Sequence, residues 1–375
     1  MTTIPIFLLG TAEVLIALYV ALWLSLAIHE LGHAVAGWFT GMEIIEIRLG
    51  SGTEIIALPF GRLTVRIATY PSQGWVLAFP TRAKFYRARW FLFALSGPLA
   101  SALTFGFLDV ISPVEARFLE WSWSWSWVSC ALQHTVRFVS LGVIFLTLWP
   151  RRCRLYGQEV LSDGFQLLQA CFLGRADGVR LFAYGQANRA RLVWAEGRRN
   201  KAVALLREAE AALGEEPDLR FCAIKASIIA EHGGQVDEAL MMLRELLAKA
   251  ESDWNLYGEI ANVFGLIVIC ENLAAEFPEA EQIIRKAIAA CPDQITLSGT
   301  LGGILVEQGR HEEAAPLLKA LNYVSPEPHE QAITAAYLAH TSLRSGDPEA
   351  ARSYADKAMS VCPGHRLVKR LVRSL

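Results

Sequence analysis

Apolar and polar residues change their spacing near residue 165, which divides the chain into two halves of different character. In the first half, long stretches without charge alternate with short basic segments, a pattern typical of membrane-crossing helices. In the second half, charged residues recur at helical spacing among Ala, Leu and Glu. The sequence therefore predicts a membrane-embedded half over residues 1–170 and an all-helical cytoplasmic half over residues 171–375.

Three apolar segments of the first half are predicted to cross the bilayer. They cover about residues 5–39, 89–111 and 127–150, and each is long enough for a hydrocarbon core of about 30 Å. Lys and Arg gather between the first and second segments and directly after the third. Because cytoplasmic loops carry an excess of basic residues, we expect the N-terminus outside the cytoplasm and the second half of the chain inside it.

Polar groups of the outer half of the membrane have two interpretations each. Arg137 and His134 lie within the third segment, where we expect Asp109 to pair with Arg137, and a role in gating substrate entry is the alternative. Four tryptophans alternate with serines just before the third segment: Trp121, Trp123, Trp125 and Trp127. Their indole rings are expected in the outer headgroup layer of the membrane, although an ordinary amphipathic loop explains them equally well.

Residues 43–80 are predicted to form a small β-hairpin insert, because branched and polar residues alternate there between glycines. We expect this sheet to lie against the inner face of the membrane. Its edge could hold an extended substrate strand by backbone pairing, and the alternative is a structural loop packed on the spans.

Composition excludes several classes of function. The net charge of −2 gives no support for a nucleic-acid partner, since the basic clusters adjoin apolar segments. The seven cysteines form no CxxC pair, so neither a disulfide framework nor a thiolate zinc site is indicated. The chain has no Lys or Arg before Arg48, which argues against a cleaved signal peptide and predicts that the first span is retained.

The inner end of the first span carries the sequence His29-Glu30-Leu31-Gly32-His33, an HExxH motif. Two histidines four residues apart share one helical face and can bind one Zn²⁺, while Glu30 can take a proton from metal-bound water. Ionisable groups near bilayer depth are costly unless they coordinate a metal, pair or line a wet cavity. The motif therefore predicts a zinc site with Glu30 as general base.

A hydrolytic zinc site needs a third protein ligand. The carboxylates available are those of Glu43, Glu46, Glu54, Asp109 and Asp163. Asp109 is expected near the outer surface, far from His29, whereas Asp163 follows an inward-running span. On topology Asp163 is the favoured ligand, and Glu54 is the second choice.

Three motifs in this order resemble the site-2 protease family of intramembrane metalloproteases. After the HExxH motif come Ser96-Gly97-Pro98-Leu99-Ala100, and then Trp149-Pro150 with Leu161-Ser162-Asp163-Gly164. The resemblance covers roughly residues 12–170. It implies one zinc ion per chain held by His29, His33 and Asp163, a single-span membrane protein as substrate, and a place in the lipid bilayer of a bacterial cell membrane.

The same resemblance assigns substrate handling to Gly97, Pro98, Thr147 and Gly164, although helix packing is the favoured alternative for Gly97 and Pro98. Members of the family usually carry Asn at the position of Thr147 and commonly at that of Ser101. A hydroxyl is shorter than a carboxamide, so substrate binding and activity could be reduced. The alternative function is therefore a membrane-anchored scaffold with a weakly active or inactive protease fold.

Residues 171–375 show helix pairs that repeat at intervals of 34 to 41 residues. We expect Ala at an equivalent place in the second helix of each pair, namely Ala202, Ala239, Ala280, Ala314 and Ala350. This period and the intervening glycines resemble the tetratricopeptide repeat, which implies a solenoid with a surface for a protein or peptide partner. The predicted fold is thus mainly α, a polytopic protease core followed by a tetratricopeptide-like solenoid.

Overall fold

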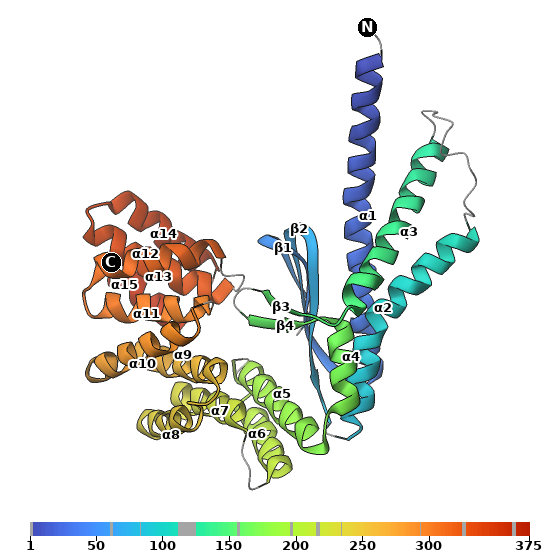
Figure 1. Cartoon of the computed structure of the whole chain (residues 1–375). Coiled ribbons are helices and arrows are strands. Elements are labelled where there is room, and N and C mark those ends of the chain that lie inside the picture. The colour runs from blue at the N-terminus through green and yellow to red at the C-terminus, as the bar shows by residue number, and fades with distance from the viewer. Residues whose placement is uncertain are drawn as a thin grey trace. The chain divides into compact units, whose positions relative to one another are not determined.

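The chain forms two compact units, shown together in Figure 1. The first comprises Met1–Cys153 and Val160–Phe182, and the second comprises Arg154–Glu159 and Ala183–Leu375. The structure is a computed structural model. It describes residues 3–60, 63–82, 84–111, 125–155, 158–195, 198–214, 218–233, 235–292, 294–324, 328–361 and 365–375.

Three long helices make the frame of the first unit and pack against one another: α1 (Thr3–Phe39), α2 (Tyr86–Ile111) and α3 (Trp125–Leu148). The hydroxyl oxygens of Ser25 and Ser140 lie 3.3 Å apart between α1 and α3. A Cβ atom at Gly32 would lie 2.6 Å from the backbone oxygen of Ser96. Small residues therefore permit close helix crossings, as in membrane helix bundles.

Two helical segments are long and apolar enough to cross a membrane, judged by length and composition: Leu15–Phe39 and Tyr86–Leu108. In the third predicted span, the apolar helical stretch found among the described residues is Leu132–Leu148, which is shorter. Large apolar side chains on these helices, such as Ile16 and Phe107, are exposed. The insertion of this unit into a bilayer stays a prediction.

The strand-rich insert contains β1 (Met42–Phe60) and β2 (Leu63–Pro80), which pair antiparallel. Both strands are bent. The segment of residues 46–49 has partners on each side, namely residues 64–67 and residues 74–77. Residues 54–60 pair in turn with residues 63–68, so the two long strands fold into a sheet wider than a single hairpin.

The sheet lies alongside α1 (Figure 1). Its place against the inner face of the membrane stays a prediction. The hydroxyl group of Tyr19 donates a hydrogen bond to the backbone oxygen of Thr69 at 3.4 Å. Gly50 lies directly against the ring of Trp23, where a Cβ atom would be 2.8 Å away. Trp23 precedes the end of α1 by roughly 24 Å at helical rise, so the sheet reaches that far along the helix.

A second small sheet and a short helix follow α3. Strands β3 (Arg152–Leu155) and β4 (Gln158–Leu161) pair with each other. Helix α4 (Asp163–Phe172) then packs against α2 and α3. The guanidinium group of Arg87 donates to the backbone oxygen of Ala170 at 3.3 Å and holds the end of α4 beside the start of α2.

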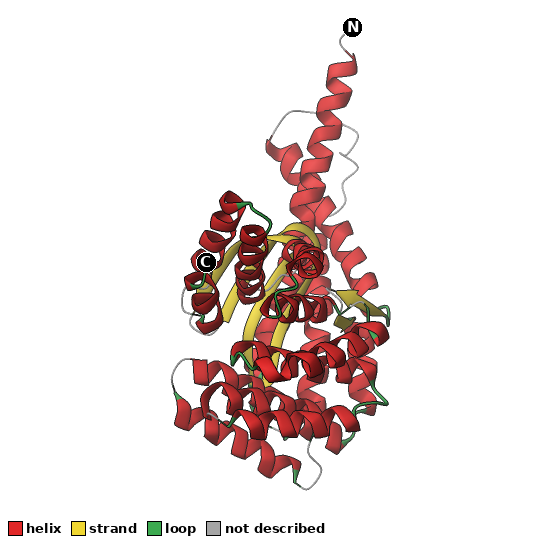
Figure 2. Cartoon of the chain, turned by 90° about the vertical axis from the view of Figure 1, so that its left-hand side faces the viewer, coloured by secondary structure: helices red, strands yellow, loops and turns green. Residues whose placement is uncertain are grey.

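The second unit is an array of paired helices, as Figure 2 shows by its nearly all-helical ribbon, and this confirms the predicted helical-repeat half. Helix α5 (Arg175–Ala195) begins in the first unit and enters the second at Ala183. The helices that follow it are α6 (Arg199–Leu213), α7 (Leu219–Gly233), α8 (Val236–Lys249), α9 (Trp254–Cys270), a short 3-10 helix (Ala274–Glu276), α10 (Phe277–Ala290), α11 (Ile295–Glu307), α12 (His311–Val324), α13 (Pro328–Arg344), α14 (Pro348–Val361) and α15 (Arg366–Arg373). Alternate helices stack closely, and a Cβ atom at Gly265 would lie 2.6 Å from the Thr300 side chain.

The predicted alanine positions are right in four repeats and off by one residue in the fifth. Ala202, Ala239, Ala280 and Ala314 are each the fourth residue of the second helix and are fully buried. In α14 the fourth residue is Ala351, which is buried, whereas its neighbour Ala350 is half-buried. The small side chain is required where the second helix approaches the first. Two of the glycines that separate the predicted helices in the sequence, Gly197 and Gly234, lie outside the described residues.

Candidate metal centre

Two histidines of α1 and an aspartate of α4 meet at one point inside the first unit. The Nε2 atom of His29 lies 2.9 Å from Oδ2 of Asp163 and 3.3 Å from Nε2 of His33. The Nε2 atom of His33 lies 3.3 Å from Oδ1 of Asp163. The helical spacing of the HExxH motif puts both imidazoles on one face of α1, and the folding of α4 onto α2 and α3 brings Asp163 to that face.

Helix α2 fixes the outer nitrogen of each imidazole. The Nδ1 atom of His33 donates to the backbone oxygen of Phe93 at 2.7 Å, since a carbonyl accepts hydrogen bonds and cannot donate them. The Nδ1 atom of His29 lies 3.1 Å from the hydroxyl group of Ser101. Such outer partners set the tautomer that leaves Nε2 free for a metal. Ser101, where the site-2 protease family commonly has Asn, therefore contacts His29, a predicted zinc ligand.

The start of α4 is held in place by Ser162, which precedes the aspartate. Its hydroxyl group donates to the backbone oxygen of Trp149 at 2.9 Å and accepts from the backbone nitrogens of Arg151 at 3.0 Å and Phe165 at 3.4 Å. These bonds cap the helix and tie it to the end of α3. No role was predicted for Ser162, although a serine just before a helical segment is a recognisable cap signal in a sequence.

Gly164 and Asp163 begin α4 in a tight space. A Cβ atom at Gly164 would lie 1.9 Å from the backbone oxygen of Leu148, so any side chain there would push α4 away from α3. Gly164 is therefore a packing residue in this structure, and it determines where the neighbouring carboxylate lies. The substrate-handling role predicted for Gly164 stays a prediction.

The candidate ligands and the general base are all buried. His29, Glu30 and His33 are 3–5% exposed, and Asp163 is 9% exposed. Burial by itself would raise the pKa of the Asp163 carboxyl, but its polar contacts with the imidazoles of His29 and His33 outweigh burial and lower that pKa to about 2. Asp163 is therefore ionised at neutral pH, as a carboxylate ligand of zinc must be.

Two glycines bring backbone against the reactive side chains. A Cβ atom at Gly74 would lie 2.6 Å from Oε1 of Glu30, so the sheet passes directly over the predicted general base. A Cβ atom at Gly97 would lie 2.3 Å from Nε2 of His33 and 2.7 Å from Nε2 of His29. Gly97 thus forms a wall of the metal site. Pro98 lies within α2 directly after it, where it removes one backbone donor from the helix.

The other predicted candidates lie elsewhere. Glu46 and Glu54 each pair with Arg66 within the sheet, at 3.0 and 2.7 Å. Glu43 lies in β1, opposite Phe79. The side chain of Asp109, and with it the predicted pair with Arg137, lies outside the described residues, as do Trp121 and Trp123. Glu54, the second choice for the third ligand, is therefore engaged in an ion pair of the sheet.

Thr147 hydrogen-bonds within its own helix. Its hydroxyl group lies 3.5 Å from the backbone oxygen of Ile144, one turn earlier in α3. The hydroxyl group is half-buried there. The structure thus gives Thr147 a contact that does not involve the histidine cluster.

No protein-family model and no curated protein matches this chain. Three solved structures are similar to about half of this chain. A thermophilic TPR protein of Thermus thermophilus, TTC0263, is 18% identical over 51% of this chain and 97% of its own length, with a TM-score of 0.40. A point mutant of MamA is 21% identical over 48% of this chain and 96% of its own, with a TM-score of 0.32. A second MamA structure is 22% identical over 49% and 93%, with a TM-score of 0.30.

The two imidazole nitrogens and the Asp163 carboxylate could hold a zinc ion. Ligand atoms held 2.0–2.1 Å from zinc in a tetrahedron lie about 3.3 Å from one another. Here the two Nε2 atoms are 3.3 Å apart, and separate oxygens of Asp163 lie 2.9 Å from Nε2 of His29 and 3.3 Å from Nε2 of His33. His33 already donates through Nδ1, so its Nε2 offers a lone pair to the cluster in the neutral imidazole. A shared cation would account for the convergence of two imidazole nitrogens and a carboxylate in a buried space.

Removing the hydroxyl group that contacts His29 should weaken zinc binding. We expect Ser101→Ala to lower zinc affinity by about 10- to 100-fold, because the His29 ring loses the partner of its Nδ1 atom. The measurement is competition with a chromophoric chelator. Thr104→Val is the control, since it also removes a hydroxyl group from α2, one that bonds within the helix to the backbone oxygen of Ala100 at 2.9 Å. Equal affinities in the Ser101→Ala and native proteins would contradict this role.

Proposed function

We propose that this chain is an intramembrane zinc endopeptidase that hydrolyses peptide bonds of membrane-spanning substrate proteins. The observation that carries the proposal is the meeting of His29, His33 and Asp163 within 4.8 Å beside the buried carboxyl group of Glu30. Two histidines and one carboxylate are a ligand set found in hydrolytic zinc sites, where a fourth position is kept for water. The resemblance to the site-2 protease family implies the same ligand set.

The roles of the side chains follow from their positions. A bound zinc ion would polarise the scissile carbonyl and acidify a water molecule. Glu30 follows His29 directly and is expected to accept the proton of that water and pass it to the leaving amine. Ser101 and the oxygen of Phe93 keep the imidazoles oriented. Gly97 and Gly74 leave the space that the reacting groups require.

The depth of the site along α1 supports a substrate within the bilayer. His33 and His29 precede the end of α1 by six and ten residues, or roughly 9 and 15 Å at helical rise. The helix is apolar over Leu15–Phe39. Polar groups at such depth are tolerated where they bind a metal or line a cavity. A peptide bond in a regular helix is shielded, so the substrate is expected to unwind before cleavage.

The repeat unit supplies the second part of the proposed function. Stacked helix pairs create extended surfaces that bind other proteins. We therefore assign to this unit the binding of a substrate or regulator protein on the cytoplasmic side. We propose this localisation because the basic loops of the sequence favour an N-terminus outside the cytoplasm.

A membrane-anchored scaffold is the second candidate, and Thr147 is the observation that favours it. Its hydroxyl group bonds within α3. The site-2 protease family usually has Asn at this position, and the Asn carboxamide can hydrogen-bond the backbone of a substrate. A chain with intact zinc ligands and weak substrate handling would bind its partners and cut them slowly.

Metal analysis and cleavage of a membrane reporter distinguish the two candidates. The full chain, purified in neutral detergent, should contain about one zinc per chain. Cleavage of reporters drawn from a library of single-span proteins should stop when a chelator removes the metal and return when zinc is restored. Zinc without any metal-dependent cleavage would favour the scaffold. Absence of zinc at saturating concentration would contradict both the ligand assignment and the enzyme.

A further inference from the structure

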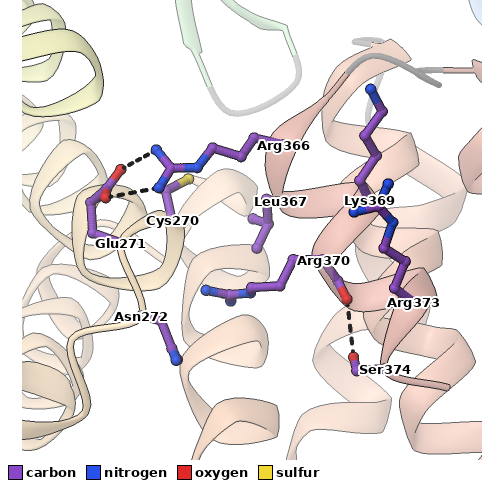
Figure 3. A pocket seen from close by; sticks show the side chains of 9 residues that line it. All are labelled: Cys270, Glu271, Asn272, Arg366, Leu367, Lys369, Arg370, Arg373 and Ser374. Carbon is purple, nitrogen blue, oxygen red and sulfur yellow. Dashed lines mark hydrogen bonds and ion pairs between the residues drawn. The ribbon is translucent and has the colours of Figure 1, made fainter.

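The last helix of the chain and the turn that follows α9 enclose a recess of about 520 Å³ within the second unit. Figure 3 shows Arg366 and Arg370 extending from α15 toward the turn at Glu271 and Asn272. Lys369 and Arg373 also line the recess. It lies in the repeat unit and shares no residue with the zinc cluster.

Helix α15 is amphipathic and carries one sign of charge. Its sequence, RLVKRLVR, has four cations and no acid. Its apolar residues Leu367, Val368 and Leu371 are buried in the array, being 0–4% exposed. The cations are therefore left on the accessible face. A stripe of four positive charges beside a recess attracts a ligand of opposite charge.

Two of these cations already bind carboxylates of the same chain. Arg366 donates two hydrogen bonds to Glu271, at 3.1 and 3.4 Å, and Arg370 pairs with Glu307. The Arg366 side chain is 76% exposed, so its ion pair with Glu271 is weak and can exchange. Among the described residues, no ion pair joins Lys369 or Arg373 to an acidic side chain.

The geometry favours a peptide over a lipid surface. A helix that lies on a membrane must bury its apolar face in the acyl region, and here that face packs into the helical array. The recess is also concave, with volume for a few side chains. The Arg366 contact with Glu271 demonstrates that a carboxylate fits the fork of this guanidinium.

We propose that α15 and the Glu271–Asn272 turn form a docking site for a carboxylate-rich segment of a partner protein. In this site partner carboxylates contact Lys369 and Arg373 and displace Glu271 from Arg366. Glu271 is thus an internal competitor that occupies the site when the partner is absent. The inference rests on the proposed partner-binding role of the repeat unit and does not depend on proteolysis.

The test uses the full chain in neutral detergent and fluorescein-labelled hexaglutamate, with hexaglutamine as the uncharged control. Lys369→Gln with Arg373→Gln should weaken hexaglutamate binding by about tenfold, since each exposed ion pair is worth up to about fivefold. Glu271→Gln should strengthen binding by about threefold. The matched control, Lys201→Gln with Arg207→Gln, removes two exposed cations of α6 and should leave affinity unchanged. Added salt should weaken binding.

Several outcomes would overturn the docking site. One is equal binding of hexaglutamate and hexaglutamine, and another is equal loss in the α15 and α6 double variants. Another is displacement of hexaglutamate by inorganic phosphate or phosphatidylglycerol micelles when the competitor supplies a lower concentration of negative charge than hexaglutamate does. That result would show that α15 selects phosphate groups over carboxylates. Binding is measured in parallel in Glu30→Gln protein, where it should be unchanged. If the native protein cleaves the reporter in a Glu30-dependent manner but does not bind hexaglutamate, the docking site is wrong and the proposed protease function is unaffected.

Discussion

Replacing Glu30 by glutamine is expected to slow cleavage of a membrane reporter by about 10²- to 10⁴-fold while zinc remains bound. Glutamine has nearly the shape of glutamate, so the close contact with Gly74 is preserved and the change removes the ability to accept a proton. His29, His33 and Asp163 are unaltered and should retain the metal. The expected result is therefore a full zinc site without useful turnover.

The measurement combines single-turnover cleavage of the reporter with zinc content per chain. Glu54→Gln is the matched control, because it makes the same chemical change to a glutamate that pairs with Arg66 in the sheet. It also tests the second choice for the third ligand, and we expect it to keep both zinc and activity. If Glu30→Gln cut the reporter at the native rate, Glu30 would not be the general base.

The three candidate zinc ligands could be selected from the sequence because each has a local or topological signal. The HExxH spacing fixes two imidazoles on one helical face without any tertiary information. Predicting Asp163 as a ligand required the topology as well, because it lies far from His33 along the chain. The inward direction of the third span favoured it over Asp109. The structure brings Asp163 to both histidines, and its role as a metal ligand stays a prediction until zinc is measured.

The surroundings of the site could not be predicted in the same way. Nothing in the spacing of Ser101 indicates that its hydroxyl group faces the Nδ1 atom of His29, because that contact depends on how α1 crosses α2. Likewise, Gly74 looks like a strand break in the sequence, whereas in the structure it makes room for Glu30. Contacts of this kind depend on the packing of distant elements, which a pattern of residues along the chain does not contain.

The sheet and the last repeat show two further limits. Alternation predicted strands, but their place beside Tyr19 and Trp23 depends on side-chain packing against α1. In the last repeat, Ala350 and Ala351 are adjacent, and composition cannot decide between them. The first turn of α14 decides it, since the helix begins at Pro348 and turns Ala351 inward.

Adding one methyl group at Gly97 is expected to abolish zinc binding. The new Cβ atom would lie 2.3 Å from Nε2 of His33 and 2.7 Å from Nε2 of His29, distances that real Cβ atoms do not reach. Both imidazoles would have to move, although each is restrained by a contact of its Nδ1 atom. We expect zinc affinity to fall by at least about 100-fold, more than for loss of one outer partner, and cleavage to fall with it.

Gly106→Ala is the matched control, since it makes the same substitution in the same helix at a position where no atom lies within 4 Å of the new Cβ. Both alanines favour the helix by up to about 1 kcal/mol, so helix propensity cannot explain a difference between them. Zinc content, circular dichroism and thermal unfolding of the two variants separate loss of metal from loss of fold. Since the Cβ atom points at both Nε2 atoms, native zinc affinity in folded Gly97→Ala protein would mean that these nitrogens do not hold the metal, and the centre proposed here would be wrong.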